Sequence, residues 1–267
     1  MKPQNAVLSQ EGGILMIDTK FKVVEIFRSI SGESYHSGEV AVFVRLYGCN
    51  LRCHYSENGG CDTPYGYEGD QYTEMTASEI RDKVNELSPN GFVVLTGGEP
   101  LIHPHVEELV GLLMKDGDLW IDIETNGSVD IRELIFKIKD AGYEVPVEQL
   151  IFTVDYKCPS SRMNTAMRDD YVTMIERVRK MGYEVNVKCV VADHTDLVAA
   201  ETLACKLLKD DTWSPDLEWG EHFFISPVFG SDVSYIADYI CNSDTLCWCR
   251  LQLQMHKYIW DPEKRGV

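Results

Sequence analysis

The sequence lacks long apolar runs and is poor in basic residues relative to acidic ones. A helix that crosses a bilayer takes about 20 consecutive apolar residues, and no such run occurs among the 267 residues. The first 20 residues also lack the uninterrupted apolar segment of a signal peptide. The 43 acidic and 25 basic residues give a formal net charge of −18, which repels phosphate backbones. We therefore expect a cytoplasmic protein that binds neither nucleic acid nor a membrane.

The segment from Leu46 to Tyr67, LYGCNLRCHYSENGGCDTPYGY, contains three cysteines and lacks a fourth. The whole chain has nine cysteines. An odd number cannot pair completely, and in a reducing compartment it indicates metal or redox chemistry more than disulfides. A closed tetrahedral metal site takes four protein ligands. If Cys49, Cys53 and Cys61 bind a metal, they therefore leave one position for a further ligand.

Three thiolates can bind three irons of a [4Fe–4S] cluster and leave the fourth iron open. The amine and carboxylate of S-adenosylmethionine can occupy that iron, and one-electron reduction of the sulfonium then yields a carbon radical. The spacing Cys-x3-Cys-x7-Cys does not decide between this interpretation and two simpler ones. The alternatives are a zinc site completed by His54 and three loop thiols without a metal.

Short segments rich in Val, Ile and Phe alternate with amphipathic segments along most of the chain. This alternation predicts parallel strands connected by helices, an α/β fold. Six such units are fewer than a closed barrel needs, so we expect a partial (β/α)6 TIM-like barrel, or else an open sheet. A further strand and loop, 20–34, would extend it at the N-terminal side. The predicted strands span residues 40–48, 91–100, 119–127, 149–157, 184–193 and 221–230.

The predicted helices carry their own signals. Thr76 and Glu79 have the spacing of a capping box, which begins a helix over residues 76–87. Residues 103–117 place four apolar side chains on one face and end at Gly117. The same scheme recurs over residues 130–142, 169–182 and 195–210, and a last helix is expected from the C-terminal segment.

The residues Thr96 to Pro100, TGGEP, follow the second predicted strand. Gly97 and Gly98 remove side chains, so a ligand can approach the backbone. Glu99 offers a carboxylate for a ligand ammonium. An ordinary turn with a capping acid explains the motif equally well when it is considered alone.

Polar residues also end other predicted strands. Because the carboxyl ends of parallel strands meet at one edge, these residues are expected to line one mouth and to bind an adenosyl cofactor. Each one alone is more often a turn former or a helix cap. The residues are Glu124, Asn126, Asp155, Lys157 and Ser160.

Several segments together resemble one family, the 7-carboxy-7-deazaguanine synthases of the radical S-adenosylmethionine (radical SAM) superfamily. The segments are EIFRSISGES, AVFVRLYGCNLRC, CDTPY, TGGEP, DYKCPSS and LQLQMHKYIW, spread from Glu25 to Trp260. The resemblance implies a radical SAM partial-barrel domain over residues 21–267 after an N-terminal extension over residues 1–20. It also implies a homodimer and a reductant such as flavodoxin or ferredoxin.

The reaction that the resemblance implies belongs to queuosine and 7-deazapurine biosynthesis. It converts 6-carboxy-5,6,7,8-tetrahydropterin to 7-carboxy-7-deazaguanine with loss of ammonia, and it uses S-adenosylmethionine, a [4Fe–4S] cluster and Mg²⁺. The resemblance therefore implies a lyase with a small-molecule pterin as its substrate.

The resemblance also implies roles at matching positions. Cys49, Cys53 and Cys61 would bind the cluster, and Thr63 would bind Mg²⁺. Contacts to S-adenosylmethionine, with the strand-end residues included, would come from Gly60, Asp62, Gly98, Glu99, Glu124, Asn126, Asp155, Tyr156 and Lys157. Contacts to the pterin would come from Ile30, Ser31, Gly32, Glu33, Arg45, Thr96 and His256.

The chain departs from the family pattern between Cys53 and Cys61. The family commonly has two residues there, and this chain has HYSENGG, which puts Ser56 at the family-spaced position. We interpret the difference as an insertion, because Asp62 and Thr63 keep their order after Cys61. Two other functions stay open: an activating protein for a glycyl-radical enzyme, and a non-catalytic zinc or iron–sulfur binding module. The remaining cysteines are interpreted mainly as packing residues, with a metal at Cys241, Cys247 and Cys249 left open.

Overall fold

The computed structural model describes residues 19–55, 60–88, 90–208 and 219–267. Its strands form one sheet in the order β3-β1-β2-β4-β5-β6-β7-β8-β9. Strand β1 is antiparallel to both of its neighbours, and all pairs from β2 to β9 are parallel. The strands are β1 (Lys20–Ile30), β2 (Val40–Leu46), β3 (Thr73–Thr76), β4 (Phe92–Gly97), β5 (Trp120–Thr125), β6 (Leu150–Tyr156), β7 (Glu184–Val191), β8 (Phe223–Pro227) and β9 (Arg250–Leu251).

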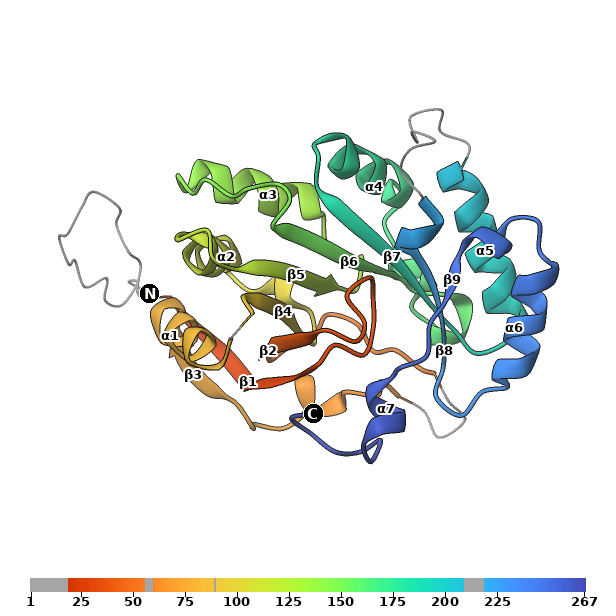
Figure 1. Cartoon of the computed structure of the whole chain (residues 1–267), viewed down its shortest axis with the longest axis horizontal. Coiled ribbons are helices and arrows are strands. Elements are labelled where there is room, and N and C mark those ends of the chain that lie inside the picture. Colours follow the sequence, from red (N-terminus) through yellow and green to blue (C-terminus); the bar gives the residue numbers. More distant parts are fainter. Residues whose placement is uncertain (1–18, 56–59, 89, 209–218) are drawn as a thin grey trace.

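The six predicted strands correspond to β2, β4, β5, β6, β7 and β8, and the predicted partial-barrel architecture is confirmed. From β2 through β4 to β9, each further parallel strand joins the same edge of the sheet, whereas β3 joins the opposite edge beside β1. Right-handed crossovers of this kind place all the helices on one face. Figure 1 shows helices α1 to α6 around the outer side of the curved sheet. They are α1 (Ala77–Leu87), α2 (Val106–Met114), α3 (Ile131–Asp140), α4 (Tyr171–Lys180), α5 (His194–Leu208) and α6 (Val233–Asn242).

The predicted N-terminal strand is β1, which pairs along its length with β2. The predicted extension over residues 1–20 lies almost wholly outside the described residues, and β1 begins at Lys20. A short helix α7 (His256–Ile259) follows β9. We call the segment that carries Cys49, Cys53 and Cys61 the cysteine loop. The segment after α7 returns toward β1, so that the C-terminus lies beside the turn after the cysteine loop (Figure 1). No helix among the described residues is long and apolar enough to cross a membrane.

Helix α1 begins with the predicted capping box. The Glu79 N–H donates to Thr76 Oγ1 over 3.2 Å, and the Thr76 N–H donates to Glu79 Oε2 over 2.8 Å. Helix α2 ends at Met114, three residues before the predicted stop at Gly117. It packs between α1 and α3, so that Leu112 is buried in addition to the predicted apolar face.

The two faces of the sheet have different chemistry. The face toward the helices carries the main hydrophobic core. The inner face is apolar near the amino ends of the strands, and we call this part the floor. Side chains two residues apart on a strand share a face. Toward the carboxyl ends of the same strands, the side chains on the inner face are polar. We call this end of the inner face the mouth. The floor consists of Ala41, Phe43, Phe92, Val94 and Ile151, and the mouth includes Arg45, Thr96, Glu124, Asp155 and Lys188.

Candidate active site

The cysteine loop leaves the carboxyl end of β2. Cys53 is buried, and Cys49 and Cys61 are half-buried. The Leu51 N–H lies 3.4 Å from the Cys49 sulfur. Burial raises the pKa of Cys53, and the nearby Cys49 thiol adds to that rise. Burial also raises the pKa of Cys61 to about 12, with smaller contributions from the Asp62 carboxylate and from Cys53. The three predicted ligands therefore lie near enough to influence one another.

The donor set fits an iron–sulfur cluster better than a single ion. Among the described residues, no three His, Cys, Asp or Glu side chains converge on one point that could hold a single metal ion. Each thiolate of a [4Fe–4S] cluster binds a different iron, so its ligands surround the cluster instead of converging on one atom. Three thiols on one loop at the mouth suit a cluster with one open iron.

The paired glycines of the TGGEP motif fix the cysteine loop. The Gly98 N–H donates to the Leu46 carbonyl over 3.2 Å, and the Glu99 N–H donates to the Gly48 carbonyl over 2.8 Å. A Cβ atom at Gly98 would lie 2.2 Å from the Gly48 oxygen and 2.8 Å from the Cys49 Cβ. Only glycine allows this approach. The motif therefore clamps the end of β4 against the residues that carry the first cluster ligand.

The Glu99 side chain ties β4 to β5. It is fully buried, and its Oε1 accepts hydrogen bonds from Thr125 Oγ1 at 2.8 Å and from the Leu101 N–H at 3.0 Å. Its Oε2 accepts from the Asn126 N–H at 2.6 Å. Burial raises the pKa of Glu99 to about 7, against the effect of these hydrogen bonds. The predicted contact of Glu99 with S-adenosylmethionine stays a prediction, because in this structure the side chain supports the neighbouring strand end.

Asn126 stands beside the cysteine loop. Its Nδ2 donates to Asn50 Oδ1 over 2.9 Å and lies 3.8 Å from the Cys49 sulfur. Its Oδ1 accepts from the Ser128 N–H at 3.0 Å. Asn126 is thus held beside Cys49, and its contact with S-adenosylmethionine stays a prediction.

Asp155, Tyr156 and Lys157 do not all face the mouth. Lys157 Nζ lies 2.5 Å from Asp155 Oδ2, and both side chains are mostly buried there. Tyr156, on the opposite face of β6, packs edge-on against Tyr171 with ring centroids 5.4 Å apart. Tyr156 could therefore meet a cofactor only through its backbone.

Two of the predicted pterin contacts lie beside Glu124. Thr96 Oγ1 donates to Glu124 Oε2 over 2.7 Å. Burial raises the pKa of Glu124 to about 7. The Lys188 ammonium opposes this rise, and the Glu33 carboxylate adds to it. Arg45 Nε donates to Glu25 Oε1 over 2.8 Å, and the charge of Arg45 also interacts with that of Glu124. Glu124 was predicted beside the cofactor, and the structure brings it next to Thr96, a predicted substrate contact.

The loop between β1 and β2, residues 31–39, turns into the mouth. Ser31 is buried, and the Glu33 carboxylate is bound by Lys188 Nζ at 2.6 Å and by Gln254 Nε2 at 2.7 Å. A Cβ atom at Gly32 would lie 2.3 Å from His256 Nδ1, so the loop and the C-terminal segment are in direct contact. The predicted pterin residues from both ends of the chain therefore gather in one place.

The cysteine loop reaches the same C-terminal segment through Asp62. Its Oδ2 lies 3.0 Å from Lys257 Nζ and 3.3 Å from Gln254 Nε2. Burial works against ionisation, but Lys257 and Gln254 hold the pKa of the Asp62 carboxyl well below its ordinary value. Thr63 Oγ1 donates to Asp62 Oδ1 over 3.2 Å. The predicted Mg²⁺ ligand thus lies beside an ionised carboxylate, a favourable setting for a hard cation.

Three further positions considered in the sequence remain, Gly60, Ser56 and Ile30. Gly60 has a positive φ of 143°, which leads the chain back to Cys61. Ser56 lies outside the described residues. Ile30 ends β1 and pairs with Val40.

The remaining cysteines differ in burial. Cys158 and Cys189 are fully buried, as packing residues are. Cys241 and Cys247 are exposed and Cys249 is half-buried.

Sequence analysis did not predict Lys188, Gln254 or Lys257. A lysine within an apolar strand, EVNVKCVV, is a signal, because a lysine is rarely buried without a charged partner. In the segment before α7, Gln252 and Gln254 are two residues apart, which puts them on one side of an extended chain. The Gln252 amide exchanges two hydrogen bonds with the Ser34 backbone, at 2.6 Å and 2.8 Å.

The chain is similar to known proteins over most of its length. The family model described as Radical SAM superfamily matches residues 43–199. A 7-carboxy-7-deazaguanine synthase of Clostridium acetobutylicum is 37% identical over 253 residues, which cover 92% of this chain and 99% of that protein. The synthase of Methanospirillum hungatei is 34% identical over 242 residues, covering 90% of this chain and 86% of the relative.

One solved structure shares the fold. The crystal structure of QueE from Escherichia coli superposes with a TM-score of 0.63 at 22% identity, and the match covers 89% of this chain and 95% of that one. At this identity the likeness concerns the fold. The family match and the relatives together show that the chain belongs to the radical SAM superfamily and, within it, to the 7-carboxy-7-deazaguanine synthase family.

Proposed function

We propose that this chain converts 6-carboxy-5,6,7,8-tetrahydropterin to 7-carboxy-7-deazaguanine with loss of ammonia. One observation carries the proposal beyond family membership. The residues expected to hold the cofactors and those expected to hold the pterin share one mouth, where Gln254 contacts both Asp62 and Glu33. A radical formed on one side of such a mouth meets the substrate without crossing solvent.

In this proposal Cys49, Cys53 and Cys61 hold the [4Fe–4S] cluster, and Asn126 and the backbone of Gly98 lie along S-adenosylmethionine. Bound together, these groups supply a one-electron reduction and a carbon radical able to remove a hydrogen atom from the substrate. The contribution of the chain is to place them, because Gly98 fixes the cysteine loop and Asn126 is fixed through its hydrogen bonds to Asn50 and Ser128.

The pterin would lie between the 31–39 loop and the strand ends. Arg45 would bind the substrate carboxylate, since its Nε bond to Glu25 orients the planar guanidinium. Glu33 would accept N–H donors of the pterin ring. Glu124 Oε2, bonded to the Thr96 hydroxyl, has a pKa of about 7 and so can hold or release a proton at neutral pH. Loss of ammonia requires such proton transfers.

Magnesium would be held at Thr63. The hydroxyl lies beside Asp62, and Mg²⁺ commonly keeps few protein ligands and completes its shell with substrate oxygens and water. We also propose a homodimer, a cytoplasmic location and a flavodoxin or ferredoxin as the reductant.

An anaerobic product assay tests the proposed function. The protein is reconstituted with iron and sulfide and incubated with the pterin, S-adenosylmethionine, Mg²⁺ and dithionite. The expected result is 7-carboxy-7-deazaguanine, identified by mass, together with 5′-deoxyadenosine. Cleavage of S-adenosylmethionine without the deazaguanine would contradict the proposed substrate, and a protein that binds zinc and cleaves nothing would contradict the enzyme class.

A further inference from the structure

Seven side chains form one continuous chain of ion pairs and hydrogen bonds across the mouth. They come from β6, β7, the 31–39 loop, the cysteine loop and the C-terminal segment. The links are between 2.5 Å and 3.4 Å long. In order, the members are Lys157, Asp155, Lys188, Glu33, Gln254, Asp62 and Lys257.

Lys188 stands at the centre of this chain. Its Nζ lies 2.6 Å from Glu33 Oε2 and 3.4 Å from Asp155 Oδ1, and the residue is only 8% exposed. Burial of an ammonium group is unfavourable unless carboxylates pair with it. Asp155 belongs to the side expected to hold the cofactor, and Glu33 belongs to the side expected to hold the pterin. Lys188 therefore links the two sides through Asp155 and Glu33, as Gln254 does through Asp62 and Glu33.

We propose that Lys188 is a positioning residue for the substrate: it fixes the Glu33 carboxylate to accept N–H donors of the pterin ring and joins it to Asp155. The inference rests on the proposed function of the preceding section. Lys188 acts through Glu33. Removing the Lys188 side chain should therefore weaken pterin binding more than it lowers kcat.

The groups that face Glu33 support this role. Lys188 approaches from β7, Gln254 and His256 from the C-terminal segment, and the Glu124 carboxyl from β5. Burial opposes ionisation of Glu33, but Lys188 holds the pKa of its carboxyl below the ordinary value. The pyrimidinone edge of a pterin presents adjacent N–H donors, which pair with an ionised carboxylate and not with a protonated one. Without Lys188, the buried Glu33 would take up a proton more readily.

The test compares Lys188→Met with Lys188→Arg and with Lys139→Met, a matched change at an exposed lysine of α3. We measure kcat and KM for the pterin, and the dissociation constant of 6-carboxypterin by its fluorescence. In Lys188→Met, both KM and the dissociation constant should rise at least about tenfold at neutral pH, with kcat within about threefold of wild type. Lys188→Arg should restore binding to within about threefold, because arginine also donates to both carboxylates. Lys139→Met should behave as wild type.

The pH dependence separates positioning from mere support of the fold. Carboxypterin binding to Lys188→Met should improve as pH rises, since Glu33 then ionises, and this dependence should be absent from wild type. In a Glu33→Gln background, Lys188→Met should have less than about a twofold further effect.

Two outcomes would overturn the inference. One is unchanged pterin binding in Lys188→Met at every pH. The other is an equal loss of binding in Lys188→Met and Lys188→Arg with a lower midpoint of thermal unfolding, which would make Lys188 a structural residue only. Absence of the deazaguanine product with wild type would instead contradict the proposed function.

Discussion

The floor and the mouth of the inner face are built from the same strands, yet they differ in chemistry. On β4, Val94 belongs to the apolar floor, and Thr96, two residues later, bonds Glu124. On β6, Ile151 belongs to the floor, and Asp155 belongs to the ion-pair chain. The floor is held by packing alone, so its side chains are replaceable by others of similar volume. The polar side chains of the mouth are held by specific hydrogen bonds and ion pairs, so the position of each side chain depends on its neighbours in the network.

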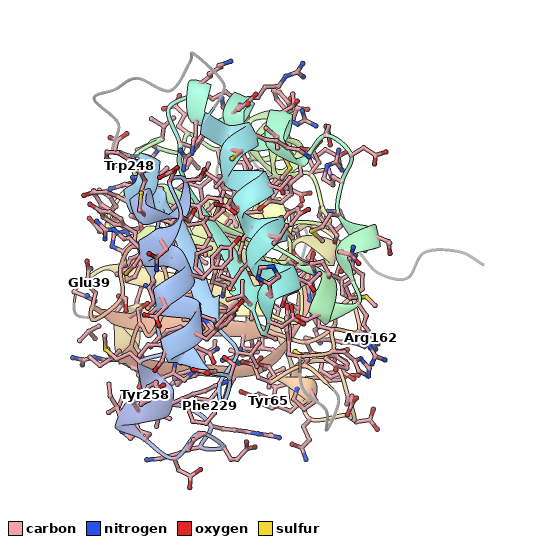
Figure 2. The ribbon with its side chains drawn as sticks, turned by 90° about the vertical axis from the view of Figure 1, so that its right-hand side faces the viewer. Glu39, Tyr65, Arg162, Phe229, Trp248 and Tyr258 are labelled. Atoms are coloured by element: carbon pink, nitrogen blue, oxygen red, sulfur yellow. The ribbon has the colours of Figure 1, made fainter. Side chains whose placement is uncertain are left out.

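Figure 2 shows that residues following different strands meet at one end of the molecule. Tyr65, after the cysteine loop, Phe229, after β8, and Tyr258, in α7, lie together at the lower end, and Trp248 lies near the opposite end. The rings of Phe229 and Tyr258 pack edge-on with centroids 5.9 Å apart. The mouth is thus edged by segments that the sequence separates widely.

The largest expected effect comes from removing a cluster ligand. Cys53→Ala should abolish retention of iron and all formation of deoxyadenosine, because two thiolates cannot hold the cluster. Iron and sulfide analysis with absorbance spectra checks this. Cys241→Ala, at an exposed cysteine of α6, is the control and should retain wild-type iron content. Full iron content in Cys53→Ala would contradict the assignment.

A methyl group at Gly98 should disturb the mouth strongly, because it would collide with Gly48 and with Cys49 of the cysteine loop. The added Cβ would lie 2.2 Å from the Gly48 carbonyl oxygen, so the cysteine loop must move. We expect Gly98→Ala to lower the free energy of unfolding by about 1–3 kcal/mol and to reduce activity per bound cluster at least about tenfold. Urea denaturation and the product assay measure the two effects.

The control for Gly98→Ala is Gly66→Ala, where the nearest atom to a new Cβ would be 3.5 Å away. Gly66→Ala should retain nearly wild-type stability and activity. A Gly98→Ala protein that matched this control would show that the close approach has no role.

A change in the floor should affect stability but not substrate binding. Ile151→Ala removes a fully buried side chain and should lower the free energy of unfolding by about 2–5 kcal/mol. The KM for the pterin should stay within about twofold of wild type, because Ile151 lies four residues before Asp155, the mouth residue of β6. A large rise in KM, with stability unchanged, would mean that floor and mouth are not separate.

The smallest effect is expected at the Thr96–Glu124 hydrogen bond. The Thr96 hydroxyl lowers the pKa of Glu124, which burial has raised to about 7. Thr96→Val removes this hydrogen bond, so the pKa should rise further. The limb of the pH profile of kcat/KM that reports Glu124 should therefore move to higher pH, by less than about one unit. A limb that moved to lower pH would contradict the sign of this effect.

The elements of the fold and the mouth could be predicted from the sequence for identifiable reasons. Strands buried on both faces give continuous Val and Ile runs, and the Thr76–Glu79 pair marks a helix start on its own. The three cysteines and the residues at strand ends share the mouth because parallel strands must end together. These are local signals or consequences of the architecture.

The ion-pair chain could not be predicted in the same way. Lys188 and Glu33 are 155 residues apart, and Gln254 and Asp62 are 192 residues apart. A single sequence carries no signal for such pairs. The face that Tyr156 takes was also missed, because a strand buried on both sides does not show by alternation which residues point inward.

The anchoring of the cysteine loop has a consequence for its variable length. On one side Cys53 is buried, and the amide of His54 donates to the Ser161 carbonyl over 2.9 Å. On the other side Asp62 Oδ2 is bound by Lys257 Nζ at 3.0 Å. Residues added between two such fixed points need not move either one, and doubling a flexible connection costs only about 0.6 kcal/mol in closure entropy. The seven-residue interval between Cys53 and Cys61 is therefore compatible with fixed positions of Cys53 and Asp62.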